Sequence, residues 1–201
     1  MLTVDQVGSR ADADRVTGVL DDGASWRDRG VVLGPDRTAG DEFQLVLTDA
    51  GPALAAALRL TREGRWSVGM GVGPVRLPLP ATTREATGDA FSAAREAVDA
   101  AKRTPLRMVV ATVAARRSAA DVTALVHLLL EVRARRSPEG WAVADLLAEG
   151  LSQAEAAERQ GVTPQAISQR ARAAGLRAED AALPALERVL AALDREVGGR
   201  R

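Results

Sequence analysis

The sequence predicts an α+β protein, in which a ferredoxin-like βαββαβ domain is followed by an all-α helix-turn-helix domain. Two observations predict the first domain: strand-like and helix-like segments alternate in that order, and glycine recurs at every second position from Gly69 to Gly73. A third observation predicts the second domain, because two short helical patterns flank a turn at Gly161.

The segments of the first domain are defined by apolar periodicity and by turn residues. One more helix and strand follow the βαββαβ order, whose helices cover one face of an antiparallel sheet and leave the other face open. In chain order the expected segments are strand Leu2–Val7, helix Ala11–Asp22, strand Val31–Leu33, strand Glu42–Thr48, helix Pro52–Leu60, strand Trp66–Gly73, helix Gly88–Arg103 and strand Leu106–Val113.

Three glycines lie on one face of the strand Trp66–Gly73, at Gly69, Gly71 and Gly73. Glycine inside a strand weakens it, so another group must approach closely to compensate. The sequence therefore predicts that a backbone, a packed helix or a ligand contacts this face.

The helix-turn-helix is predicted from capping signals. Ser152 caps a short helix with Glu155 reaching back, Gly161 supplies the tight turn, and Thr163-Pro164 starts the next helix. On that second helix we expect polar side chains suited to base edges and phosphates. The predicted DNA-binding residues are Thr163, Gln165, Ser168, Gln169 and Arg172. The alternative is a three-helix module for protein contact.

The expected domain boundaries follow these patterns. Residues 1–117 form the first domain, 118–137 a connecting helix opened by a capping box at Ser118, and 138–201 the helix-turn-helix with a C-terminal helix from near Pro184. That last helix carries an apolar stripe, so it needs a partner surface within the helix-turn-helix or in a homodimer. The stripe consists of Leu186, Leu190, Leu193 and Val197.

Charge and composition limit the partners. The chain has 27 Lys+Arg, 27 Asp+Glu, one histidine and no cysteine. No global basic field favours nucleic acid, so any DNA-binding surface must be local. A metal site would have to use carboxylates, since thiolates are absent and His127 is alone. With neither a secretory signal nor a membrane span in the pattern, we expect a cytoplasmic protein.

Two carboxylates are expected to meet at the end of the sheet. Asp41 follows a Gly40 turn, and Asp5 lies on the first strand, which pairs with the hairpin in the predicted topology. Such oxygen donors suit Mg²⁺ or Mn²⁺ and a phosphate-bearing ligand. The alternative is an ordinary hairpin whose acids are solvated.

Four short motifs in order resemble the bacterial SatD family, over roughly residues 2–176. The resemblance implies a palm-like domain related to the class III nucleotide cyclases and the diguanylate cyclases, followed by a helix-turn-helix. The motifs are Asp5-Gln6-Val7-Gly8-Ser9, Gly40-Asp41-Glu42-Phe43-Gln44, Val68-Gly69-Met70-Gly71-Val72-Gly73 and Gly88-Asp89-Ala90-Phe91-Ser92-Ala93-Ala94-Arg95.

The resemblance also implies site residues. Asp5 and Asp41 match the cyclases' metal-binding aspartates, and Arg95 matches an arginine that steadies their transition state. Two departures count against catalysis: Ser92 replaces an asparagine, and Ala39 replaces the first glycine of the diguanylate cyclase turn. The implied phosphate cradle is the backbone of Val7, Gly8 and Ser9.

Two functions follow from these observations. The first is a DNA-binding, transcription-associated regulator whose palm-like domain senses a ligand or acts as a scaffold. The alternative is a metal-dependent nucleotide-binding or cyclase-like enzyme that the helix-turn-helix targets to DNA.

Overall fold

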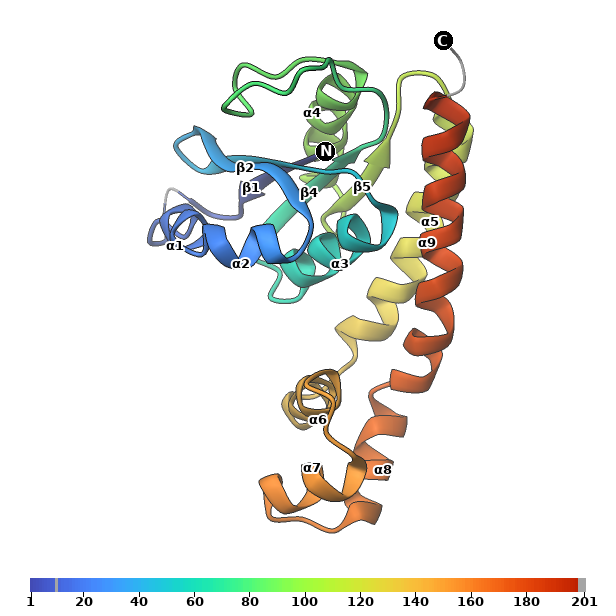
Figure 1. Ribbon diagram of the computed structural model, residues 1–201. Coiled ribbons are helices and arrows are strands. Elements are labelled where there is room, and N and C mark those ends of the chain that lie inside the picture. The colour runs from blue at the N-terminus through green and yellow to red at the C-terminus, as the bar shows by residue number, and fades with distance from the viewer. Residues whose placement is uncertain (10, 199–201) are drawn as a thin grey trace. The chain divides into compact units, whose positions relative to one another are not determined.

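The computed structural model describes residues 1–9 and 11–198 and is an α+β structure with one five-stranded mixed sheet (Figure 1). The chain divides into two compact units, and each is described by itself. The first contains Met1–His127 and the chain from Leu186 onward, and the second contains Leu128–Ala185. The predicted boundaries near residues 117 and 138 thus differ from this division, which falls inside two long helices.

The first unit begins with the sheet and the helices around it. Of the polar segment expected to be one helix over 11–22, only Val16–Asp21 is helical, and a second short helix begins after it at Gly23. The strand expected over 31–33 extends further. The elements are β1 (Leu2–Gln6), α1 (Val16–Asp21), α2 (Gly23–Asp28), β2 (Val31–Ala39), β3 (Glu42–Leu47), α3 (Ala50–Thr61), β4 (Trp66–Gly71), α4 (Asp89–Ala101) and β5 (Met108–Ala111).

The strand order is β2-β3-β1-β4-β5, so β1 lies at the centre of the sheet. β1 pairs antiparallel with β3 and with β4, and β2 pairs antiparallel with β3. β5 pairs parallel with β4, because the intervening helix α4 returns the chain to the same end of the sheet. The expectation of a wholly antiparallel sheet is therefore wrong at its last strand.

The glycine face of β4 lies directly against α4. A Cβ atom added at Gly69 would lie 2.2 Å from the backbone nitrogen of Val98, and one added at Gly71 would lie 2.0 Å from the carbonyl oxygen of Ala90. Real Cβ atoms do not approach backbone this closely, so only glycine fits. The predicted close approach is confirmed, and the partner is a helix. The expectation that one face of the sheet stays open is wrong, because α4 covers this face and α3 lies on the opposite one (Figure 1).

The opposite face of the sheet carries the main apolar core, with α3 on that side (Figure 1). Phe43 and Trp66 pack edge to face, with ring centroids 5.3 Å apart and planes at 89°. This geometry favours aromatic pairs. The fully buried side chains on these strands include Leu2, Val4, Phe43, Leu45, Val68, Met70 and Met108.

The second unit is helical. Its small core is formed by Val143, Ala156, Ala157 and Ile167. Alanines at this point allow two short helices to approach closely, which compensates for the few large side chains. The helices within it are α6 (Pro138–Ala148), α7 (Gln153–Gln160) and α8 (Pro164–Ala173).

Two helices, α5 (Arg116–Ala134) and α9 (Leu176–Gly198), each contribute residues to both units. Ser118 lies inside α5 and donates a hydrogen bond to Glu196, so the capping box predicted there is wrong. α9 begins well before Pro184, which lies inside the helix. None of the described helices is long and apolar enough to cross a membrane.

The apolar stripe on α9 is buried within the first unit, although we expected it to cover the helix-turn-helix or a second copy. This burial favours a continuous helix on the C-terminal side of Pro184 and offsets the local cost of a proline, which lacks an N–H donor. The stripe residues are Leu186, Leu190, Leu193 and Val197.

We predict that Gly71→Ala destabilises the protein by about 3 kcal/mol or more, because the added methyl group would force α4 off the sheet. Urea unfolding followed by circular dichroism measures this. Gly23→Ala is the matched control, since a Cβ there meets no atom within 4 Å. Equal stability of the two variants would contradict the close contact between α4 and β4.

Candidate functional site

Acidic residues gather where β1 and β3 pair. The register places Asp5 directly opposite Glu42, on the face that α4 covers. The backbone N–H of Gln6 donates to the carbonyl oxygen of Asp41 at 2.9 Å, so the hairpin turn lies beside the end of β1. We call Asp5, Asp41 and Glu42 the acidic rim.

Helix α4 and the residue after it supply cations to this rim. The Lys102 ammonium lies 2.8 Å from the Asp5 carboxylate, and the Arg95 guanidinium lies 2.9 Å from that of Glu42. The two cations are seven residues apart, which places them on the same face of a helix. Glu42 is only 3% exposed and also accepts a hydrogen bond from the Thr38 hydroxyl at 2.6 Å.

The charge state of Lys102 reflects its surroundings. Partial burial on its own would lower the pKa of this ammonium, but the hydrogen bond and the negative charge of Asp5 outweigh that effect. Asp99 and Glu42 add to the same effect. The pKa of Lys102 is therefore raised above its ordinary value, and the group is a cation at neutral pH.

The third acid of the rim contacts the loop after β1. The Ser9 hydroxyl donates to the Asp41 carboxylate at 2.6 Å, which joins a predicted phosphate-binding residue to a predicted metal ligand. The N–H of Val7 donates to the carbonyl oxygen of Arg65 at 2.8 Å. The Val7 N–H is therefore used inside the protein, and it does not point at a phosphate.

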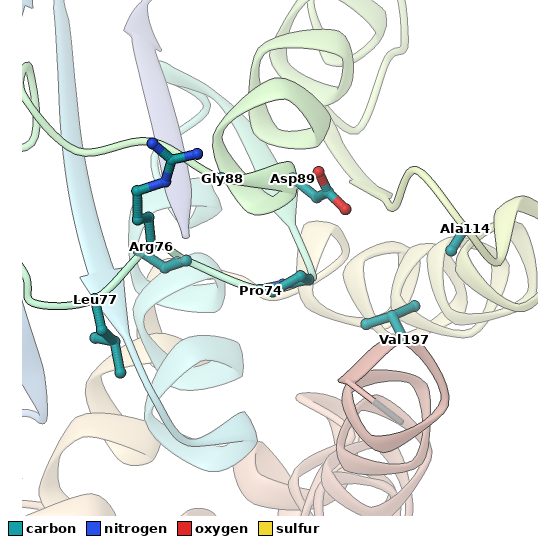
Figure 2. A pocket seen from close by; sticks show the side chains of 8 residues that line it. Pro74, Arg76, Leu77, Gly88, Asp89, Ala114 and Val197 are labelled. Atoms are coloured by element: carbon teal, nitrogen blue, oxygen red, sulfur yellow. The ribbon is translucent and has the colours of Figure 1, made fainter. Parts of the chain in front are cut away.

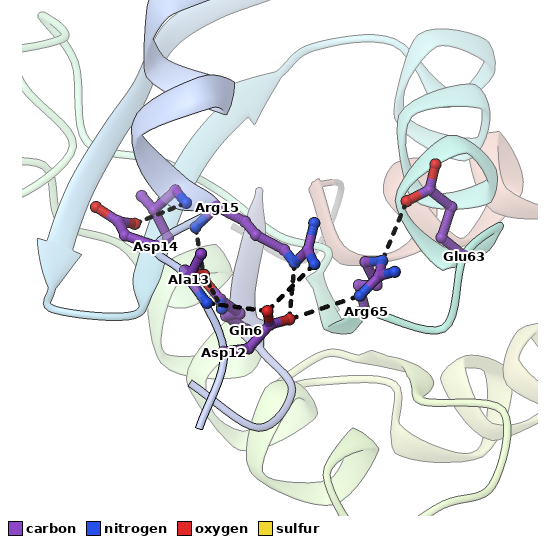
Figure 3. A network of polar contacts seen from close by, with 8 residues as sticks. Gln6, Asp12, Ala13, Asp14, Arg15, Glu63 and Arg65 are labelled. Atoms are coloured by element: carbon purple, nitrogen blue, oxygen red, sulfur yellow. Dashed lines mark hydrogen bonds and ion pairs between the residues drawn. The ribbon is translucent and has the colours of Figure 1, made fainter. Parts of the chain in front are cut away.

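A network of hydrogen bonds and ion pairs also holds this loop (Figure 3). The Gln6 side chain donates to the carbonyl of Ala13 at 2.8 Å and accepts from the N–H of Arg15 at 3.0 Å. Asp12 lies between Arg15 and Arg65, and its hydrogen bond from Arg15 lowers the pKa of its carboxyl group. The loop is thus braced by internal polar contacts.

The acidic rim does not fit a divalent metal. Mg²⁺ requires several oxygen donors in near-octahedral geometry. Asp5 and Glu42 are each paired with an intrachain cation, and Asp41 accepts the Ser9 hydroxyl. Nowhere in residues 1–9 and 11–198 do three or more acidic or histidine side chains gather as a group that could hold a metal ion by itself.

A cavity of about 620 Å³ lies at the start of α4 (Figure 2). Arg76 and Asp89 bring one cation and one carboxylate to its wall, beside the apolar side chains of Leu77 and Val197. No residue that the sequence predicted for a site lines it. The cavity therefore lies apart from the acidic rim.

The second unit forms the expected helix-turn-helix locally. Ser152 and Glu155 make a reciprocal capping box, and Gly161 is left-handed with φ 64°. The Thr163 hydroxyl accepts the N–H of Ala166, and Pro164 occupies the first turn of α8. These capping predictions are confirmed.

Burial of Ile167 fixes which face of α8 points outward. Gln165, Gln169 and Arg172 are exposed, as is Thr163 at the helix start. Ser168 is half-buried. Most of the predicted DNA-binding side chains therefore share solvent access on one short helix.

A neighbouring contact holds α8 against α7. The Arg170 guanidinium donates to the Gln160 side chain at 2.7 Å. This hydrogen bond gives Gln160 a structural role within the second unit. It also ties one of the arginines of α8 to the preceding helix.

A buried ion cluster supports the second unit. Glu179 accepts hydrogen bonds from Arg133 and Arg136, and both guanidinium groups lie over the Trp141 ring, at 4.9 and 4.8 Å from its centroid. Arg136 is 2% exposed and also donates to the Ala174 carbonyl at 2.7 Å. The cluster connects the ends of α5 and α8 with the first turns of α6 and α9.

Comparisons with family models, with curated proteins and with solved structures gave no match to this chain. Among the residues predicted for the rim, the structure brings Ser9 into contact with Asp41 and places Asp5 on the adjoining strand. Arg95 also reaches the rim, through Glu42.

The sequence reasoning named the adjacent carboxylates Asp41 and Glu42 but did not place Glu42 opposite Asp5, and it missed Lys102 as a cation beside the rim. The signal that could have found Lys102 is the spacing of cations on the helix Gly88–Arg103, where Arg95 and Lys102 are two turns apart. Alternation along β3 also places Glu42, rather than Asp41, on the same face as Asp5.

We predict that Glu179→Gln destabilises the second unit by about 3–5 kcal/mol, because Arg136 would be left buried without a counter-ion. Faster amide hydrogen exchange in α6, α7 and α8 would report the loss. Asp180→Asn is the control, since Asp180 is the exposed neighbour on the same helix. If both variants exchange like the parent protein, the cluster does not stabilise this unit.

Proposed function

We propose that the protein is a DNA-binding, transcription-associated regulator. Its helix-turn-helix would bind duplex DNA through α8, and its N-terminal unit would act as a palm-like ligand-sensing or scaffold domain. The observation that carries this proposal is the exposed polar face of α8. Thr163, Gln165, Gln169 and Arg172 are all solvent-accessible there, while Ile167 anchors the helix from the other side.

The distribution of charge supports α8 as the DNA-facing element. Residues 128–185 contain eight acidic residues and seven arginines, so the second unit as a whole is not basic. Between Arg159 and Ala178, however, there are four arginines and no acid. Phosphates are attracted to such a segment and repelled by the acidic remainder.

The chemistry of the exposed side chains also supports base recognition. Glutamine amides can pair with the N6 and N7 edge of adenine, and arginine can bind either guanine or phosphate. The N-terminal end of a helix carries partial positive charge, so Thr163 and Gln165 lie where a phosphate or a base edge is favoured. α8 therefore combines positioning contacts with side chains able to distinguish bases.

The strand pairing of the first unit supports a palm-like, SatD-type domain. The order β2-β3-β1-β4 with antiparallel neighbours is the order expected for a ferredoxin-like βαββαβ arrangement. β5 and α4 then correspond to the appended helix and strand. This agreement in topology favours the relationship that the sequence motifs suggested.

The rival function is a metal-dependent nucleotide-binding or cyclase-like enzyme. The hydrogen bond between Ser9 and Asp41 favours it, because it joins the β1 loop to the hairpin turn. The pairing of Asp5 with Lys102 and of Glu42 with Arg95 opposes it, since both acids already have counter-ions. We therefore favour a sensor or scaffold role for the first unit.

We predict that the protein binds duplex DNA with a sequence preference that survives moderate salt. Arg172→Ala should weaken binding to any duplex, because it removes a cation that can contact phosphate. Gln169→Ala should cost about 1–3 kcal/mol only at the preferred site, the usual scale of a bidentate base contact. Selection from a random DNA library followed by fluorescence anisotropy measures both effects.

Arg117→Ala is the matched control for these variants, because Arg117 is an exposed arginine of the first unit, outside the helix-turn-helix. It should leave both affinity and preference unchanged. If the library enriches no motif, or if Arg117→Ala weakens binding as much as Arg172→Ala, α8 is not the DNA-reading element.

We further propose that the protein binds DNA as a homodimer, because helix-turn-helix proteins often read two half-sites through two-fold symmetry. The α9 stripe is buried within the first unit, so the dimer contact must lie elsewhere. Light scattering at tens of micromolar protein should give twice the mass of the 21.1 kDa chain. A mass equal to that of one chain would reject the dimer.

A further inference from the structure

We propose that the Lys102 ammonium is a built-in counter-ion that takes the place of a divalent cation at Asp5, so that the acidic rim is complete without metal. This goes beyond the proposed DNA-binding function, because it concerns the first unit alone. It also opposes the Mg²⁺ or Mn²⁺ that the sequence predicted for Asp5 and Asp41.

The rim needs positive charge for structural reasons. Asp5 and Glu42 are directly opposite on neighbouring antiparallel strands, where two like charges destabilise the pairing. Glu42 is also almost wholly withdrawn from water, at 3% exposure. A carboxylate in such a place requires a partner, because burial of an unpaired charge is costly.

Arg95 on α4 and Lys102, the residue directly after α4, supply that positive charge. The backbone of α4 lies against Gly69 and Gly71, which brings the helix unusually close to the sheet. From there Arg95 reaches Glu42 and Lys102 reaches Asp5, at 2.9 and 2.8 Å. Each strand carboxylate therefore has its own cation, and the two pairs lie side by side.

These cations make the rim a poor site for a dication. A metal bound to Asp5 would have to displace Lys102 and would still be repelled by Arg95, which belongs to the neighbouring pair. Lys102 is 39% exposed, so its side chain can be replaced without opening a hole in the core. A substitution of Lys102 therefore tests the effect of its charge on metal binding without disrupting the folded core.

The decisive variant is Lys102→Met, which keeps the length of the side chain and removes its charge. Titration of the full-length protein with Mn²⁺, followed by electron paramagnetic resonance, should show no saturable binding to the parent chain. The variant should bind Mn²⁺ saturably, at least about tenfold more tightly than any residual binding of the parent chain, because the charge nearest to Asp5 is gone. Asp5→Asn in the Lys102→Met background should remove that binding.

Lys102→Arg is the matched control, since it keeps a cation beside Asp5 and should remain free of metal. Thermal unfolding gives a second readout that does not depend on the metal signal. Lys102→Met should melt at lower temperature than the parent chain in the presence of a chelator, and Mn²⁺ should restore part of the loss.

Two results would overturn the proposal. One such result is that the parent chain binds Mn²⁺ as tightly as Lys102→Met does, and that Asp5→Asn abolishes this binding. Lys102 would then not prevent Mn²⁺ from binding to Asp5. If Lys102→Met binds no Mn²⁺ and melts like the parent chain, the ammonium does not stand in for a cation at Asp5. Lys102→Gln should repeat the result of Lys102→Met, and a failure to do so counts against the charge argument.

Discussion

The close contact between α4 and the glycine face of β4 is the constraint on which the first unit depends. Gly69 and Gly71 leave no room for a side chain, and backbone atoms of Ala90 and Val98 occupy that space. The axis of α4 is therefore fixed by backbone contact rather than by adaptable side chains. Residues further along α4 then reach the strands at defined positions, which is why Arg95 and Lys102 meet Glu42 and Asp5.

Local signals in the sequence predicted much of the structure. The glycine alternation in β4 required a close neighbour whatever its identity, and the capping residues at Ser152, Gly161 and Thr163 each act within a few residues of chain. Such features depend on short-range sterics and hydrogen bonds. The caps could be predicted because they depend on neighbouring residues alone, and the close neighbour of β4 could be predicted because glycines along a strand face require one.

Features set by distant contacts could not be predicted in the same way. The burial of the α9 stripe in the first unit pairs residues after Leu186 with segments far earlier in the chain, and the proline at position 184 suggested a helix start instead. The role of Lys102 depends on the register between β1 and β3 together with the position of α4. The first relation leaves no pattern in the residues around it, and the second leaves only the two-turn spacing of Arg95 and Lys102.

The chain has no net charge, but its charges are distributed differently in two places: acids and cations are paired at the acidic rim, whereas arginines predominate around α8. On the acidic rim, Asp5 and Glu42 are each matched by a cation of the same chain, so the rim offers little net attraction to an anionic or cationic partner. Around α8 the arginines are not accompanied by acids in the sequence from Arg159 to Ala178. Long-range attraction of a polyanion depends on unbalanced charge, whereas internally paired charges mainly stabilise the fold. A chain with no net charge can therefore carry an unbalanced positive segment around one short helix, and under the proposed function DNA would bind there.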